Sequence, residues 1–126
     1  MNKRTFITGA FLCLLAVFFG AFGAHGLRDE IEPSSLENWK TAVQYQFFHA
    51  LALLLISNIS GVLRFVNIIF CLFLSGIILF SGSLYLLSTR NLTGISGSFL
   101  GPLTPLGGLL LIAGWGVAIA GALKSK

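Results

Sequence analysis

Charged residues are scarce in this chain: they make up 10% of its 126 residues, and only four of them are acidic. A soluble domain carries about 25% charged residues and uses them to cover its surface. This chain has 56% hydrophobic residues and a mean hydropathy of +0.92, so it lacks the polar residues for such a surface. The composition therefore excludes a soluble enzyme, a nucleic-acid-binding protein and a disordered tail, and it predicts a protein solvated largely by lipid.

The sequence also lacks the motifs of familiar enzymes and transporters. It contains no HExxH, GxSxG or P-loop pattern. Its long apolar runs hold no Asp, Glu, Lys or Arg, so they offer neither a buried carboxylate pair nor a voltage sensor. Cys13 and Cys71 lie inside these runs and are interpreted as small core residues rather than a disulfide. We therefore expect a non-enzymatic protein with no catalytic residue, bound metal or cofactor.

Four long apolar runs are what the chain does contain. They cover about residues 5–27, 41–60, 67–88 and 103–123. A membrane-spanning helix needs about 20 mostly apolar residues, and only a helix satisfies the backbone of such a run in lipid. The first run is longer than the apolar region of a secretory signal peptide and lacks a clean A-x-A cleavage site, so we interpret it as an uncleaved span. The predicted fold is an all-α integral membrane four-helix bundle, with residues 1–126 forming a single four-span domain.

The distribution of basic residues predicts the orientation. Four spans place both termini on one side, together with Lys3, Arg4, Arg64, Lys124 and Lys126. The other side holds Arg28, Lys40 and Arg90. Because cytoplasmic loops carry an excess of Lys and Arg, we expect both termini in the cytoplasm.

Small residues recur at intervals of seven in three of the runs. They are Gly9, Ala16 and Gly23 in the first run, Gly76 and Ser83 in the third, and Gly107, Gly114 and Gly121 in the fourth. In lipid, small residues allow helix backbones to approach closely, and a seven-residue period is typical of a left-handed seam. The pattern predicts helix packing within the bundle, and it is equally compatible with a seam between copies of the chain.

Polar residues gather in the predicted outer half of the spans. This set comprises His25, Tyr45, Gln46, His49, Ser81, Ser83, Tyr85 and Thr104. Tyr45 and His49 are four residues apart on one helical stripe, and His49 lies roughly 12 Å along the helix from Thr41 at 1.5 Å per residue. Intramembrane polar residues are costly and suggest a function by default. Since all four helices contribute, we predict one shared polar pocket.

Several roles for this pocket stay open. The two histidines are suited to proton relay or pH sensing, and the pocket to a quinone or a lipid headgroup. A metal site is weakly supported, because a third ligand would have to come from Tyr, Gln or a loop acid such as Asp29. Alternatively, the polar residues only form interhelical hydrogen bonds, which contribute about 0.6 kcal/mol each.

The favoured function is a non-enzymatic accessory or small-ligand-binding membrane protein. One alternative is a small oligomeric transporter or channel with His49 in its pathway. The other is a lipid- or quinone-linked membrane enzyme that uses His25 and His49 as its acid and base. The expected partners are the lipid bilayer and either a second copy of the chain or another membrane protein, with no nucleic acid.

Four segments carry a resemblance to a known family. They are GAFGAHGL at 20–27, WKTAVQYQFFHAL at 39–51, LFSGSLYLL at 79–87 and GPLTPLGGLLLIAGW at 101–115. In this order they resemble the YgdD/YwdK-like family of small four-span inner-membrane proteins, a domain of unknown function. The resemblance covers essentially the whole chain and implies a protein with four spans in a bacterial plasma (inner) membrane, but no activity. The motif positions it implies are His25, Trp39, Tyr45, His49, Ser81, Ser83, Tyr85, Pro102, Thr104 and Trp115.

Overall fold

The computed structural model describes residues 1–125, and helices are the regular elements within them. They are α1 (Lys3–His25), α2 (Pro33–Asn58), α3 (Val66–Ser88), α4 (Arg90–Thr93) and α5 (Leu100–Leu123). The described residues contain no strand, which confirms the all-helical class.

Three of these helices, α1, α3 and α5, are long and apolar enough to cross a membrane. The fourth long helix, α2, does not reach that hydropathy, because polar side chains within its apolar part, such as Gln44, Gln46 and His49, lower it. Three candidate spans are therefore found where the sequence predicted four.

The ends of the helices follow local sequence signals. At the start of α1, the side chain of Asn2 accepts a hydrogen bond from the backbone N–H of Thr5. At the start of α2, Pro33 occupies the first turn, where its missing N–H is not needed. The helix therefore begins eight residues before the second apolar run, which starts at about residue 41. Hydropathy marks where a helix becomes apolar, whereas Pro33 marks where this one begins.

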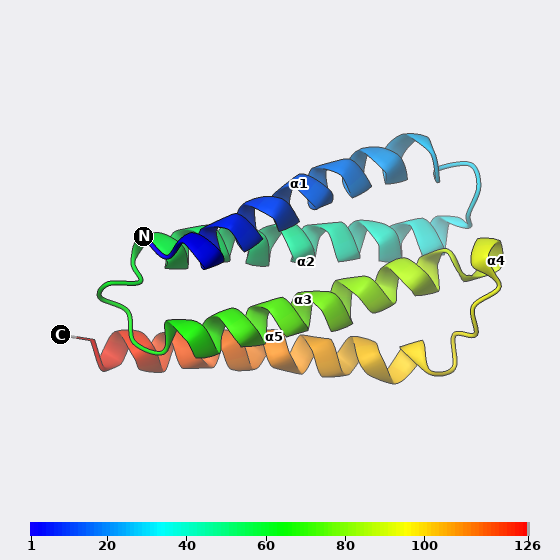
Figure 1. Cartoon of the computed structure of the whole chain (residues 1–126). Helices are drawn as coiled ribbons and strands as arrows, with labels where there is room; N and C mark the ends of the chain where they lie inside the picture. Colours follow the sequence, from blue (N-terminus) through cyan, green and yellow to red (C-terminus); the bar gives the residue numbers. More distant parts are fainter. Residues whose placement is uncertain (126) are drawn as a thin grey trace.

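The four long helices pack as neighbours in the order in which they occur in the chain. Extensive contacts join α1 with α2, α2 with α3, and α3 with α5. Figure 1 shows α1 and α5 at the outer edges and the less apolar α2 beside α3 between them. Both termini lie at one end of the molecule with the α2–α3 connection, and α4 lies at the other end with the α1–α2 connection. Lys126, which was counted in the orientation argument, lies outside the described residues.

The seven-spaced small residues lie at contacts within the chain. A β-carbon on Gly9 would lie 2.9 Å from the carbonyl oxygen of Ala50 in α2, and one on Gly23 would lie 2.6 Å from the indole of Trp39. Ala16, between them on α1, is buried. The first row of small residues therefore faces α2, so it does not present a free seam to a second copy.

The other small residues lie where α5 meets α3 and the turn before it. A β-carbon on Gly76 of α3 would lie 2.6 Å from the side chain of Leu111, and one on Gly114 would lie 2.5 Å from the ring of Phe73. Gly107 faces the backbone of Leu79 and Phe80, Gly121 faces the carbonyl of Arg64, and the hydroxyl of Ser83 contacts that of Thr104. The backbones of α3 and α5 are close because these positions have no bulky side chain.

Candidate functional site

His49 lies near the middle of α2, buried, with both ring nitrogens engaged. Its Nδ1 is 2.8 Å from the carbonyl oxygen of Tyr45, one turn earlier on the same helix. The indole Nε1 of Trp115 in α5 donates to Nε2 of His49 at 2.9 Å. Because a carbonyl oxygen only accepts and an indole N–H only donates, this pairing requires a neutral imidazole with its proton on Nδ1. His49 thus links α2 to α5 and has no free nitrogen for a metal or a proton carrier.

Gln46 joins α2 to the helices on both sides of it. Its Nε2 donates to the carbonyl oxygen of Leu12 in α1 at 2.8 Å. Its Oε1 accepts from the hydroxyl of Tyr85 in α3 at 2.7 Å. The amide is buried, so these two bonds replace the water that it loses on insertion. Gln46 and Tyr85 therefore bind three helices together.

Trp39 extends this network toward the start of α2. Its Nε1 donates to the carbonyl oxygen of Phe19 in α1 at 2.9 Å. Its ring packs against Phe19 and Phe22 of α1, with centroids 6.0 and 5.9 Å away, and against Tyr85 of α3 at 4.6 Å. Gly23 makes room for this buried indole. The Trp39 ring therefore fills the space between α1 and α3.

The hydroxyl groups of α3 complete the interhelical contacts. The Oγ of Ser81 donates to the carbonyl oxygen of Ala42 in α2 at 2.7 Å. The Oγ of Ser83 lies 2.6 Å from Oγ1 of Thr104 in α5. The eight predicted pocket residues are thus not gathered around one space. Most of them form separate hydrogen-bonded pairs between neighbouring helices.

His25 and Tyr45 do not belong to these pairs. His25 is exposed at the end of α1, two residues after Gly23, which meets Trp39 of α2. Trp39 precedes His49 by ten residues or roughly 15 Å of helix. The ring of Tyr45 is 41% exposed and stacks on the imidazole of His49 with centroids 6.1 Å apart. Among the described residues no hydrogen bond joins His25 to His49, whose two ring nitrogens bond to Tyr45 and Trp115 instead.

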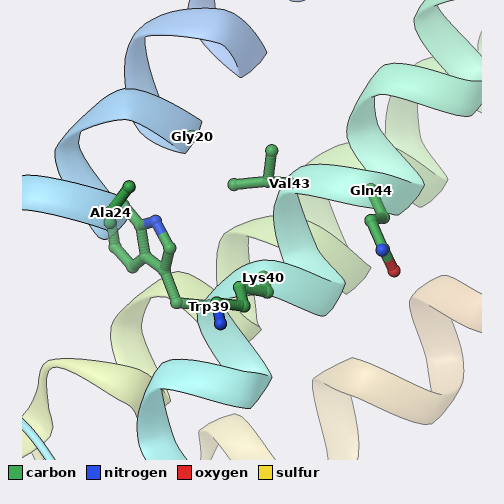
Figure 2. Close-up of a pocket in the computed structure, with 7 residues that line it drawn as sticks. Gly20, Ala24, Trp39, Lys40, Val43 and Gln44 are labelled. Atoms are coloured by element: carbon green, nitrogen blue, oxygen red, sulfur yellow. The ribbon is translucent and has the colours of Figure 1, made fainter. Parts of the chain in front are cut away.

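A cavity of about 200 Å³ lies elsewhere, between α1 and α2 toward the end that holds the α1–α2 connection. It is lined by Gly20, Gly23, Ala24, Trp39, Lys40, Val43 and Gln44. Figure 2 shows Gly20 and Ala24 on α1 facing the α2 side chains, with the Trp39 ring between the two helices. None of the eight predicted pocket residues lines it. The sequence did not predict this cavity. Its one local sign is the missing side chain at Gly20, which the structure places opposite Val43.

Two tryptophans were also missed as members of the network. Trp115 lies in the middle of an apolar run, where its indole N–H has no water to bond and needs a protein acceptor. That requirement was readable from the sequence, but the acceptor was not.

Among the described residues, no group of three His, Cys, Asp or Glu side chains is placed to hold a metal ion.

Comparisons with known proteins place the chain among bacterial membrane proteins. A family model described as "Protein of unknown function (DUF423)" matches residues 19–108. The chain is 42% identical to the UPF0382 membrane protein YwdK of Bacillus subtilis (strain 168), over 97% of this chain and 98% of the relative. It is 46% identical to a UPF0382 membrane protein of Staphylococcus aureus (strain bovine RF122 / ET3-1), over 97% of each. No solved structure matches the chain. These matches confirm the family resemblance that the four sequence segments indicated.

Proposed function

The chain belongs to the DUF423 family of bacterial membrane proteins, and we propose that it is a non-enzymatic accessory protein of the plasma membrane. In this proposal it crosses the membrane four times, has both termini in the cytoplasm, and binds a small ligand in the cavity between α1 and α2.

The packing of α2 supports its place as a fourth span. Its 26 residues extend about 39 Å, more than the roughly 30 Å of a bilayer core. It packs along α1 on one side and α3 on the other, and both neighbours are apolar enough to span. Its lower hydropathy is offset by hydrogen bonds to α1, α3 and α5. These contacts support a fourth crossing by α2 beside its two neighbours.

The observation that carries the proposed function is the contrast between the polar network and the cavity. His49, Gln46, Ser81 and Ser83 are buried, and their side chains already bond within the chain. The cavity between α1 and α2, in contrast, has an unfilled volume with Lys40 and Gln44 in its lining. Ligand binding is therefore better placed at the cavity than at the predicted polar pocket.

The same contrast disfavours the two alternatives. A channel through His49 needs a water-accessible path, whereas this imidazole lies between Tyr45, Phe73 and Trp115. An enzyme that uses two histidines needs both within hydrogen-bond reach of one substrate. His25 ends α1 two residues after Gly23, which meets Trp39, and Trp39 is ten residues before His49 on α2. The network is instead suited to holding the helices together.

The proposal is tested by native mass spectrometry of the protein released gently from its membrane. We expect the wild-type protein to carry a bound small molecule, and Gly20→Leu to lose it because the new side chain fills the cavity. Room exists for that side chain, since a β-carbon on Gly20 meets only Val43, at 3.5 Å.

Two further variants serve as controls. Gly116→Leu in α5 adds the same bulk where nothing lies within 4 Å, and it should keep the bound molecule. His49→Ala should also keep it, although it weakens the fold. If the wild type is bare, or if His49→Ala loses the molecule while Gly20→Leu keeps it, the ligand site proposed here is wrong.

A further inference from the structure

We propose that the cavity between α1 and α2 holds one acyl chain of a phospholipid with a zwitterionic headgroup, whose phosphate lies on the Lys40 ammonium and whose own ammonium lies on the Glu37 carboxylate. This inference rests on the proposed function and names the ligand of that site. Phosphatidylethanolamine is the probe that carries this chemistry.

The size and lining of the cavity favour a chain over a compact ligand. Pockets that enclose a drug-sized molecule are roughly 300–1,000 Å³, and this one is about 200 Å³. Its lining is mostly apolar, from Gly20, Ala24, Val43 and the ring of Trp39. A space of this kind accommodates part of a flexible apolar chain that continues outward, which describes a lipid tail.

The position of the cavity places it against the bilayer. It lies between two helices rather than inside the hydrophobic core, and Phe18 and Phe22 of α1 nearby are exposed. In a membrane, exposed apolar side chains of this kind face lipid tails. Gly20 is the position where α1 presents no side chain toward Val43, so a lipid tail enters there without displacing protein atoms.

Lys40 lies at the polar end of the cavity. It immediately precedes the apolar part of α2, so its ammonium sits at the level of the lipid phosphates when α2 spans the membrane. Its Nζ is 3.5 Å from Oε1 of Glu37, one turn earlier, and both side chains are more than half exposed. An exposed pair of this kind is weak and opens at little cost. The pair therefore offers a cation and an anion side by side at the cavity rim.

The surrounding charges decide which headgroup fits. The segment before the apolar part of α2 carries all four acids of the chain, and Arg28 and Lys40 are its only bases. This excess of negative charge repels a headgroup that is purely anionic. A zwitterion avoids the repulsion, because its phosphate pairs with Lys40 while its ammonium pairs with Glu37. The Lys40–Glu37 pair thus matches a zwitterionic headgroup in both charges.

The test is a competition in nanodiscs that contain equal amounts of phosphatidylethanolamine and phosphatidylglycerol. The full chain is released from the nanodiscs, and its retained lipids are identified by native mass spectrometry. We expect one phosphatidylethanolamine per wild-type chain, retained in excess over phosphatidylglycerol. Lys40→Gln should lower lipid retention about fivefold, the size expected for one exposed charge contact. Glu37→Gln should keep a bound lipid but lose the preference for phosphatidylethanolamine.

Controls separate this inference from the proposed function. Lys124→Gln removes a cation at the opposite end of the molecule and should leave retention unchanged. Equal retention of both lipids by the wild type, or unchanged retention in Lys40→Gln, would overturn the lipid assignment. A bound molecule that depends on Gly20 but is not a phospholipid would overturn the lipid assignment alone. A wild type with no bound molecule would overturn the proposed function as well.

Discussion

At the scale of single residues, the buried side chains of Gln46 and His49 in α2 are matched to partners on other helices. An unpartnered amide or imidazole in the apolar interior loses its hydrogen bonds to water without replacement. Gln46 and His49 avoid this loss through Leu12, Tyr85 and Trp115. These bonds specify which face of α2 is turned toward each neighbour. They therefore fix the rotation of α2 in the bundle in addition to stabilising the fold.

The Gln46–Tyr85 bond leads to the first stability prediction. Tyr85→Phe removes the hydroxyl that donates to Gln46 Oε1, and we expect it to lower the free energy of unfolding by about 0.6 kcal/mol, and at most by about 1.7 kcal/mol. Gln46→Leu loses this bond and the one to Leu12, and should cost more. Unfolding by SDS in mixed micelles measures both, and a double-mutant cycle isolates their coupling.

Ser75→Ala is the matched control for this pair. Ser75 donates only to carbonyl oxygens of its own helix, at Cys71 and Leu72, so its removal breaks no contact between helices. Its stability should stay close to that of the wild type. Additive effects of Tyr85→Phe and Gln46→Leu would contradict the bond, because two residues that share an interaction are expected to be coupled.

At the scale of helices, close approach of backbones depends on a few glycines rather than on all of them. On α5, Gly107 and Gly114 face α3, whereas Gly116 on the same helix has nothing within 4 Å. The helix is therefore packed along one narrow row, and its other faces carry large apolar side chains such as Ile112 and Ile119 that are exposed. In lipid this division suits a helix that contacts protein on one side and acyl chains on the others.

Alanine substitutions on α5 test this division. We expect Gly107→Ala to destabilise the fold by about 1–3 kcal/mol, because the new methyl group meets the backbone of Leu79 and Phe80, which has little freedom to move. Gly116→Ala meets no atom and should be neutral or stabilising by up to about 1 kcal/mol, the gain in helix propensity. Thermal unfolding in detergent compares the two. Equal effects at both positions would show that α5 does not pack against α3 through this row.

At the scale of the whole molecule, the number of spans determines which ends face the cytoplasm. The structure has three helices that meet a span criterion by hydropathy and a fourth, α2, packed between two of them. If α2 crosses the membrane, the α2–α3 connection lies on the side of the termini and the α4–α5 connection on the other side (Figure 1).

Cysteine labelling distinguishes four spans from three. In a background with Cys13→Ala and Cys71→Ala, we expect Ser96→Cys to react with a membrane-impermeant maleimide on intact cells. Gly61→Cys should react only after permeabilisation. Both positions are exposed in the structure, so access depends on the side of the membrane. If α2 does not cross while the N-terminus stays cytoplasmic, the pattern is reversed.

Local properties of the sequence are enough to identify the class of this protein. Scarcity of charge and long apolar runs predicted a helical membrane protein, and the described helices and the family matches confirm it. These properties are readable because hydropathy and the need to satisfy the backbone in lipid act locally along the chain. The number of spans and the cytoplasmic termini stay predictions.

Which polar groups meet, and where space is left between the helices, depends on the tertiary structure. The sequence placed eight polar residues in the same half of the spans, but whether they share a pocket depends on how each helix is rotated and how far it slides along its neighbour. The rotation and slide of the helices bring Gln46 to Tyr85 and His49 to Trp115. They also leave His25 outside these pairs and open a cavity beside Gly20. Rotation and slide are set by contacts between residues far apart in the chain, and no local pattern in a single sequence encodes them.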